Sequence, residues 1–165
     1  LATFVQLMGE EEAFEYLKAL HANVNQYTKS GSAPIKAAAQ GETMIGIVFQ
    51  HDAVTQKVAG FPIEVVSPCE GTGYEIGSMS IIKGARNPES ARTFYDFVLR
   101  ADIQSQAGDV GASQVPSNTN ATPPEEAPDF SEINLIDYDF KEFGSADTRA
   151  RLLERWDNEV GSLPN

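Results

Sequence analysis

The spacing of hydrophobic residues alternates between a helical and a strand-like pattern. Apolar positions that recur every three or four residues, together with helix start and stop residues, predict helices over residues 1–9, 10–23, 32–41, 53–59, 88–99, 102–108 and 145–160. A helical turn is predicted over residues 138–143. Short apolar runs with β-branched residues predict buried strands over residues 44–49, 62–67 and 74–82. Helices and strands that alternate through short connections are typical of an α/β layer with parallel strands.

The segment around residues 70–91 has the clearest local signals for secondary structure, in the order loop, strand, loop and helix. Gly71 and Gly73 allow unusual backbone angles before the predicted strand, and Asn87 followed by Pro88 is typical of a helix start. The strand carries one carboxylate, Glu75, which we expect to point inward among apolar neighbours. Such a carboxylate needs a partner, which could be a pair of ligand hydroxyls, a backbone N–H or an arginine elsewhere in the fold.

Composition narrows the class of protein. The 165 residues are 41% hydrophobic and 22% charged, as in one ordinary globular domain. The net charge of −12 argues against nucleic acid and anionic membranes as partners, although a local cluster of N–H groups could still hold an anion. Cys69 is the only cysteine, which excludes an internal disulfide and a cysteine-rich metal site.

The start of the sequence reads as a helix entered partway, with no cap residue before Leu1. We therefore expect the sequence to be a piece of a longer chain. On that expectation, the lack of a signal peptide carries no information about the destination of the protein.

Two short constellations are candidate binding residues. His51 and Asp52 follow the predicted strand 44–49, and ligands of open α/β sheets bind beyond the carboxyl ends of strands. The alternative is that Asp52 caps the next helix while His51 is merely exposed. Ser30 and Gly31 precede a helix start and offer hydroxyl and N–H groups to a phosphate or carboxylate, although most helices begin this way.

Enzymatic signatures are missing from the sequence. Only two histidines are present, and His21, at the end of a predicted amphipathic helix, is expected to lie on the surface. One remaining histidine is too few for the metal-dependent phosphohydrolases in which His-Asp doublets occur. No nucleophile elbow, dinucleotide-binding motif or phosphate loop is found. The sequence therefore predicts a protein that is not an enzyme, with no catalytic residue, no bound metal and no cofactor.

Several short segments, taken in their order and spacing, carry a resemblance to a known family. They are residues 41–47, 68–75, 87–97, 104, 114–118, 137–140 and 151–156. Together they resemble the second half of the solute-binding proteins of bacterial ABC importers, in the branch usually labelled ferric-iron type.

This resemblance implies a type II periplasmic-binding-protein fold, with a mixed sheet flanked by helices and a ligand between two lobes. Residues 1–76 would belong to the second lobe, residues 77–118 would cross to the first, and residues 119–165 would return to the second. The partners implied are a small solute, an ABC permease in the inner membrane, and either the missing amino-terminal part or a swapped copy of the chain. The location implied is the periplasm, or an extracytoplasmic lipoprotein.

The resemblance also bears on the ligand. Ferric-binding members carry two adjacent tyrosines where this chain has His51 and Asp52, which leaves a ferric site in doubt. His51, Asp52 and Glu75 resemble instead the residues with which sugar-phosphate-binding members hold sugar hydroxyls. Ser30 and Gly31 would then touch the phosphate. Two alternatives remain open, namely Fe³⁺ bound with an accompanying anion, and a ligand-sensing receptor module with the same fold.

Overall fold

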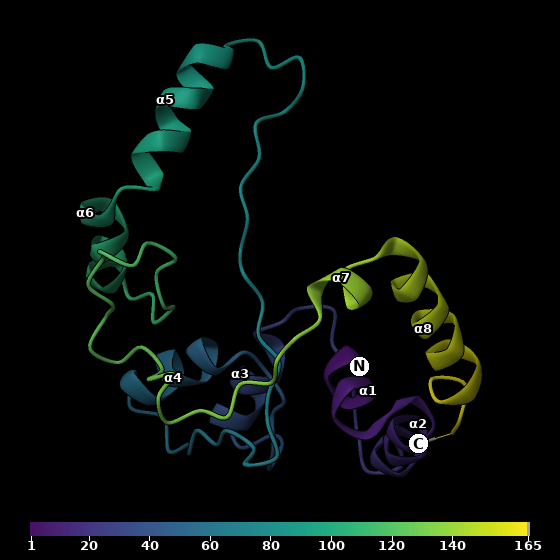
Figure 1. Cartoon of the computed structure of the whole chain (residues 1–165). Coiled ribbons are helices and arrows are strands. Elements are labelled where there is room, and N and C mark those ends of the chain that lie inside the picture. Colours follow the sequence, from purple (N-terminus) through teal and green to yellow (C-terminus); the bar gives the residue numbers. More distant parts are fainter. Residues whose placement is uncertain (165) are drawn as a thin grey trace. The chain divides into compact units, whose positions relative to one another are not determined.

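The computed structural model describes residues 1–164, whose contacts fall into two units (Figure 1). The first unit comprises Leu1–Lys29, Ser67–Tyr74 and the segment from Phe130 to the last described residue. The second comprises Ser30–Val66 and Glu75–Asp129. This grouping does not test the assignment of residues 1–76, 77–118 and 119–165 to lobes, which stays a prediction.

Four helices build the first unit. They are α1 (Ala2–Met8), α2 (Glu10–His21), α7 (Phe140–Phe143) and α8 (Ala146–Glu159). The apolar stripes of α1, α2 and α8 enclose a core of Val5, Ala13, Phe14, Leu17, Leu152 and Val160. Burying each large side chain of this kind contributes about 1.5–3 kcal/mol, so this core is the main source of stability in the first unit.

Capping residues define where the last two helices begin. The Asp139 side chain accepts hydrogen bonds from the backbone N–H groups of Lys141 and Glu142, at 3.0 and 2.9 Å. Ser145 Oγ accepts from the backbone N–H of Thr148 at 3.1 Å. These bonds satisfy donors that have no partner inside the helix. The predicted start of the final helix at residue 145 is therefore confirmed.

A charged cluster of Arg155, Glu10, Glu11 and Glu159 lies next to the core residue Phe14 in the first unit. The Arg155 guanidinium donates to Glu10, Glu11 and Glu159 at 2.8–2.9 Å in its shorter contacts. Its central carbon also lies 4.2 Å from the centroid of the Phe14 ring. These hydrogen bonds lower the pKa of the Glu11 and Glu159 carboxyl groups and raise the pKa of Arg155. The cluster thus links α2 and α8 through hydrogen bonds between Arg155 and the two glutamates of α2.

The two glycines before residue 74 are required for different reasons. Gly71 has φ of 129°, and a Cβ there would lie 2.9 Å from Ile136 Cγ2. Gly73 does not have a positive φ, but a Cβ there would overlap the Thr3 hydroxyl oxygen. The expectation of an unusual backbone angle is confirmed for Gly71, whereas Gly73 is needed because another element approaches closely.

The second unit contains the other helical elements. They are α3 (Ala33–Ala39), α4 (Gln50–Val58), α5 (Pro88–Val98), α6 (Ala101–Gln104) and the 3-10 helix η1 (Ser105–Val110). Helices α3 and α4 pack together, with Ile35, Ala39 and Ala53 buried. The helix predicted over 102–108 is thus two elements, α6 followed by η1.

The predicted strands are extended but unpaired. Residues 44–49, 62–67 and 74–82 form no ladder, and residues 1–164 contain a single isolated parallel bridge, between Thr72 and Leu135. Figure 1 shows the chain that leads into α5 as a long extended thread. A strand is held by hydrogen bonds to a neighbouring strand. No such neighbour lies alongside in the part of the chain described, so the expected mixed sheet is not formed there.

Side-chain exposure agrees with the missing ladders. Met44 is 100% exposed, Ile45 80% and Val66 81%, although the sequence pattern predicts that all three are buried. Apolar runs of this kind are typical of strands covered on both faces. The extended segments therefore have the composition of inner strands without the neighbours that inner strands need.

Candidate functional site

The candidate site is built around the first turn of α4. This helix begins at Gln50, three residues before the predicted start, with Phe49 in the N-cap position. His51 and Asp52 therefore lie within the first turn, and both are half-buried. Asp52 is the third helical residue and not the cap, so the alternative in which Asp52 caps this helix is wrong. A carboxylate in a first turn is favoured by the helix dipole.

Three side chains surround the imidazole of His51. Its ring stacks on Phe49, with ring centroids 5.6 Å apart and an interplanar angle of 15°. Its Nε2 lies 3.2 Å from Nε2 of Gln114 and 3.7 Å from Oδ1 of Asp52. The first contact is within hydrogen-bond distance and the second is beyond it. The site thus presents an oriented imidazole beside a carboxylate, a pair that can donate to and accept from hydroxyl groups.

The break at Ser30 and Gly31 lies beside the same turn. Both residues are exposed, and the Ser30 carbonyl accepts a hydrogen bond from the backbone N–H of Ala33 at 3.3 Å, just as α3 begins. A Cβ on Gly31 would lie 3.9 Å from Cε2 of Phe49. The structure therefore brings Gly31 next to the residue on which His51 stacks. The predicted helix start after this break is confirmed.

Glu75 does not join this group. Its side chain is exposed in the extended segment, and within residues 1–164 it makes neither a hydrogen bond nor an ion pair with another residue. The expectation of an inward, buried carboxylate is not met, because the strand that would bury it has no neighbours. The role of Glu75 toward a ligand stays a prediction.

One contact residue and one buried histidine were missed by the sequence patterns. Gln114 reaches His51 from 63 positions along the chain, so no local pattern could indicate it. His21 is 3% exposed, and the prediction of a surface histidine is wrong. Its Nδ1 lies 3.0 Å from the Tyr27 hydroxyl and its Nε2 lies 2.9 Å from the Leu163 carbonyl oxygen. The spacing of His21 four positions after buried Leu17 was the signal that could have predicted this burial.

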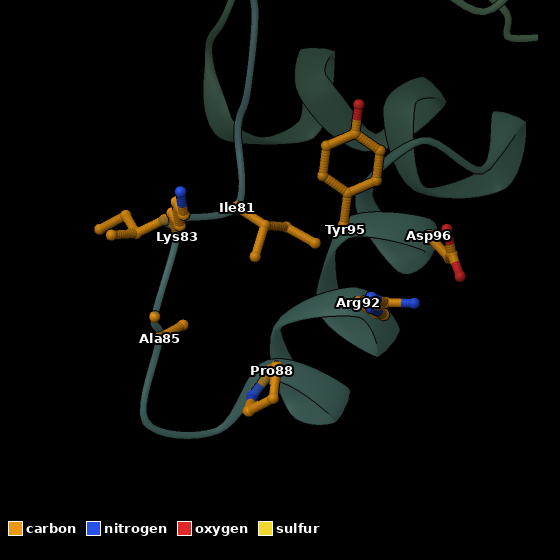
Figure 2. Close-up of a pocket in the computed structure, with 9 residues that line it drawn as sticks. Ile81, Lys83, Ala85, Pro88, Arg92, Tyr95 and Asp96 are labelled. Carbon is orange, nitrogen blue, oxygen red and sulfur yellow. The ribbon is translucent and has the colours of Figure 1, made fainter.

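A separate open cavity of about 720 Å³ lies between the extended segment and α5. Its lining residues are Ile81, Ile82, Lys83, Gly84, Ala85, Pro88, Arg92, Tyr95 and Asp96. Figure 2 shows Ile81 pointing from the extended segment toward Tyr95 on the helix. The residues predicted to bind ligand do not line this cavity.

Over residues 1–164, histidine, cysteine, aspartate and glutamate side chains do not come together in groups of three that could hold a metal ion. The helices in this range are all too short or too polar to cross a bilayer.

A family model and two solved structures that resemble this chain all describe binding proteins. A family model described as "Bacterial extracellular solute-binding protein" matches residues 1–142. The structure of the periplasmic binding protein AfuA from Actinobacillus pleuropneumoniae, with exogenous fructose-6-phosphate bound, is 49% identical with a TM-score of 0.93. That match covers 98% of this chain and 51% of AfuA. The periplasmic binding protein P5PA is 42% identical with a TM-score of 0.88, over 96% of this chain and 51% of P5PA.

Curated relatives agree in family and differ in length. An uncharacterized protein of Haemophilus influenzae is 50% identical over 161 residues, which are 97% of this chain and 46% of that protein. A spermidine/putrescine-binding periplasmic protein of Salmonella typhimurium is 33% identical over 99 residues, 60% of this chain and 28% of that protein. The chain spans about half the length of the first of these relatives and of both solved structures.

Proposed function

Because the chain belongs to the family of bacterial extracellular solute-binding proteins, whose members are binding proteins and not enzymes, we propose that it acts in the uptake of a phosphorylated sugar or a similar polyol phosphate. In this proposal it belongs to the solute-binding component of an ABC importer. The observation that carries the proposal is the similarity to AfuA, at 49% identity and a TM-score of 0.93, in a structure with fructose-6-phosphate bound. The family is extracellular, and we propose the periplasm as the location.

Each candidate residue has a role in this proposal. His51 and Asp52, held together in the first turn of α4, orient ligand hydroxyls by donating and accepting hydrogen bonds. Glu75 supplies a second carboxylate acceptor once its segment is ordered around the ligand. Ser30 and Gly31 contact the phosphate. Buried polar groups left unpaired by a wrong sugar penalise its binding, so such a site selects among polyols.

The extended segments complete the fold that we propose. Residues 44–49, 62–67 and 74–82 become strands of a mixed sheet when the half that the longer relatives possess, or a swapped second copy, supplies neighbouring strands. The ligand then lies between two lobes that close by a hinge motion and present it to a permease in the inner membrane. The assignment of residues 1–76, 77–118 and 119–165 to these lobes forms part of the proposal.

A chimera tests this proposal. The chain is joined to the half of the Haemophilus influenzae relative that it does not match, and binding is measured by titration calorimetry with fructose 6-phosphate, inorganic phosphate, ferric citrate and spermidine. We expect fructose 6-phosphate to bind. Asp52→Asn should weaken binding by about 10- to 100-fold, because a hydrogen bond to a charged group is worth about 1.5–3 kcal/mol.

Asp109→Asn provides the matched control, since Asp109 is an exposed carboxylate of the same unit outside the site. Binding of ferric citrate or spermidine in place of the sugar phosphate would contradict the proposed ligand. Equal effects of Asp52→Asn and Asp109→Asn would contradict the proposed role of Asp52.

Polyamine binding is a second candidate. The similarity to the spermidine/putrescine-binding protein of Salmonella typhimurium favours it, and so does the net charge of −12, which attracts a polycation. The spermidine arm of the same titration decides between the two ligands.

A further inference from the structure

Gln114 lies beside the imidazole of His51, although 63 positions separate the two residues in the sequence. We propose that Gln114 is a positioning residue of the site: its side-chain N–H donates to Nε2 of His51 and holds the neutral imidazole with its hydrogen on Nδ1. The structural part of this proposal concerns His51 alone. Its consequence for a ligand rests on the proposed function.

The donor chemistry of the contact supports this assignment. The two closest atoms, 3.2 Å apart, are Nε2 of Gln114 and Nε2 of His51. With the amide nitrogen facing the ring, the amide donates and the ring nitrogen supplies the lone pair. The neutral ring then carries its hydrogen on Nδ1. A free neutral histidine side chain in water carries it mainly on Nε2, so the contact selects the less common tautomer.

The surroundings of the ring leave Gln114 as its hydrogen-bonding partner at Nε2. Asp52 Oδ1 is 3.7 Å from the same nitrogen, which is too far for a hydrogen bond. Stacking on Phe49, at 5.6 Å and 15°, holds the plane of the ring. The ring plane and the hydrogen position are therefore controlled by different side chains.

The loop that carries Gln114 is itself held in place. Gly111, with φ of 77°, turns the chain out of η1, and Ser113 is only 7% exposed. Farther along, Gln104 Oε1 accepts from the backbone N–H of Asn118 at 2.9 Å. The Asn118 side chain donates to the Leu99 carbonyl oxygen at 2.8 Å. These contacts fix the backbone on both sides of Gln114, whose own side chain is exposed and meets His51.

A fixed tautomer determines what His51 can offer to a ligand. With Nε2 occupied by Gln114, the remaining polar group of the ring is the Nδ1–H donor. The Asp52 carboxylate, whose Oδ1 lies 3.7 Å from Nε2, supplies an acceptor near the other ring nitrogen. A residue pair that offers both a donor and an acceptor matches sugar hydroxyls better than it matches a polycation, which only donates. Gln114 would thus favour a polyol through His51.

Nitrogen NMR of the full chain tests the assignment. The ring nitrogens of ¹⁵N-labelled protein are observed at about pH 8.5, well above the ordinary histidine pKa of about 6.5. We expect Nδ1 of His51 to carry the hydrogen in the wild type. His21 is the internal reference with the opposite tautomer, since its Nε2 must donate to the Leu163 carbonyl oxygen.

Variants make the test specific. Gln114→Leu removes the donor and should move the hydrogen of His51 toward Nε2, and Gln114→Glu should do so more completely because a carboxylate only accepts. Gln106→Leu is the matched control, since Gln106 is an exposed glutamine that bonds to the Asp102 carbonyl oxygen. A wild-type His51 with its hydrogen on Nε2, or one that Gln114→Leu leaves unchanged, would overturn the proposal.

Ligand binding separates this inference from the proposed function. In the chimera, Gln114→Leu should weaken fructose 6-phosphate binding about ten-fold, in line with one hydrogen bond. If the wild-type chimera does not bind the sugar phosphate but the NMR tautomers are as expected, the proposed function fails and the role of Gln114 stands. If it binds with the other tautomer, the role of Gln114 fails and the proposed function stands.

Discussion

Phe14 is the residue whose replacement should most weaken the first unit. Its side chain is 0% exposed and packs in the core with Val5, Leu17, Leu152 and Val160. Truncating a buried phenylalanine to alanine costs about 3–5 kcal/mol, since it removes apolar contacts and leaves a cavity. Losing the cation–π contact with Arg155 adds about 0.5–1 kcal/mol. We therefore expect Phe14→Ala to lower the free energy of unfolding of this unit by about 4 kcal/mol.

Urea unfolding followed by tryptophan fluorescence measures this loss. Trp156 is the only tryptophan, packs against the same core, and meets Tyr27 edge to face with ring centroids 5.6 Å apart. Its emission therefore reports unfolding of the first unit. With a slope of about 2 kcal/mol per molar urea, the midpoint should fall by about 2 M.

Two further variants serve as a milder substitution and as a control. Phe14→Leu, which keeps much of the volume, should cost less than about 1.5 kcal/mol and remains measurable if Phe14→Ala does not fold. Phe130→Ala is the matched control, because Phe130 is a 51% exposed phenylalanine of the same unit, and its cost should stay within about 0.5 kcal/mol. A Phe14→Ala midpoint equal to that of the wild type, or an equal loss in Phe130→Ala, would refute the core described here.

Two other predictions concern the same unit. Hydrogen bonding to Arg155 lowers the pKa of Glu11 in the folded protein. Its contribution to the free energy of unfolding is therefore complete above the unfolded-state pKa of about 4.3. That contribution is lost as the pH falls through the lower pKa of the folded state. Arg155→Met should therefore lower the melting temperature at pH 7 and flatten its decline toward pH 3; an unchanged acid profile would contradict this. Gly71→Ala should cost about 1–3 kcal/mol, because φ is 129° and a Cβ would press on Ile136. Gly9→Ala, where φ is 83° but a Cβ meets nothing within 4 Å, should cost less in the same urea titration, and equal costs would argue against a contribution from the Ile136 contact.

Helices were predictable because the interactions that form them are local. The predicted helix over 88–99 matches α5 at Pro88–Val98, and the helix over 145–160 matches α8 at Ala146–Glu159. Each helical hydrogen bond joins residues four apart, and a cap such as Ser145 acts within three residues. Such information lies within a short window of sequence.

Strands and the surroundings of the site depend on distant residues. The run 44–49 has the composition of a buried strand, but a strand needs a neighbour, and in the described chain it has none. The adjacency of His51 and Asp52 was visible in the sequence, whereas their place inside the first turn of α4 was not.

The sequence by itself determined the helices, the family resemblance and the candidate pair His51 and Asp52. Only the tertiary structure decided that His21 is buried, that Glu75 is exposed, and that Gln114 reaches His51. The physical reason is that burial and contact depend on the path of the whole backbone, which brings together residues as far apart as His21 and Leu163. The secondary-structure propensity of a short segment does not predict that path.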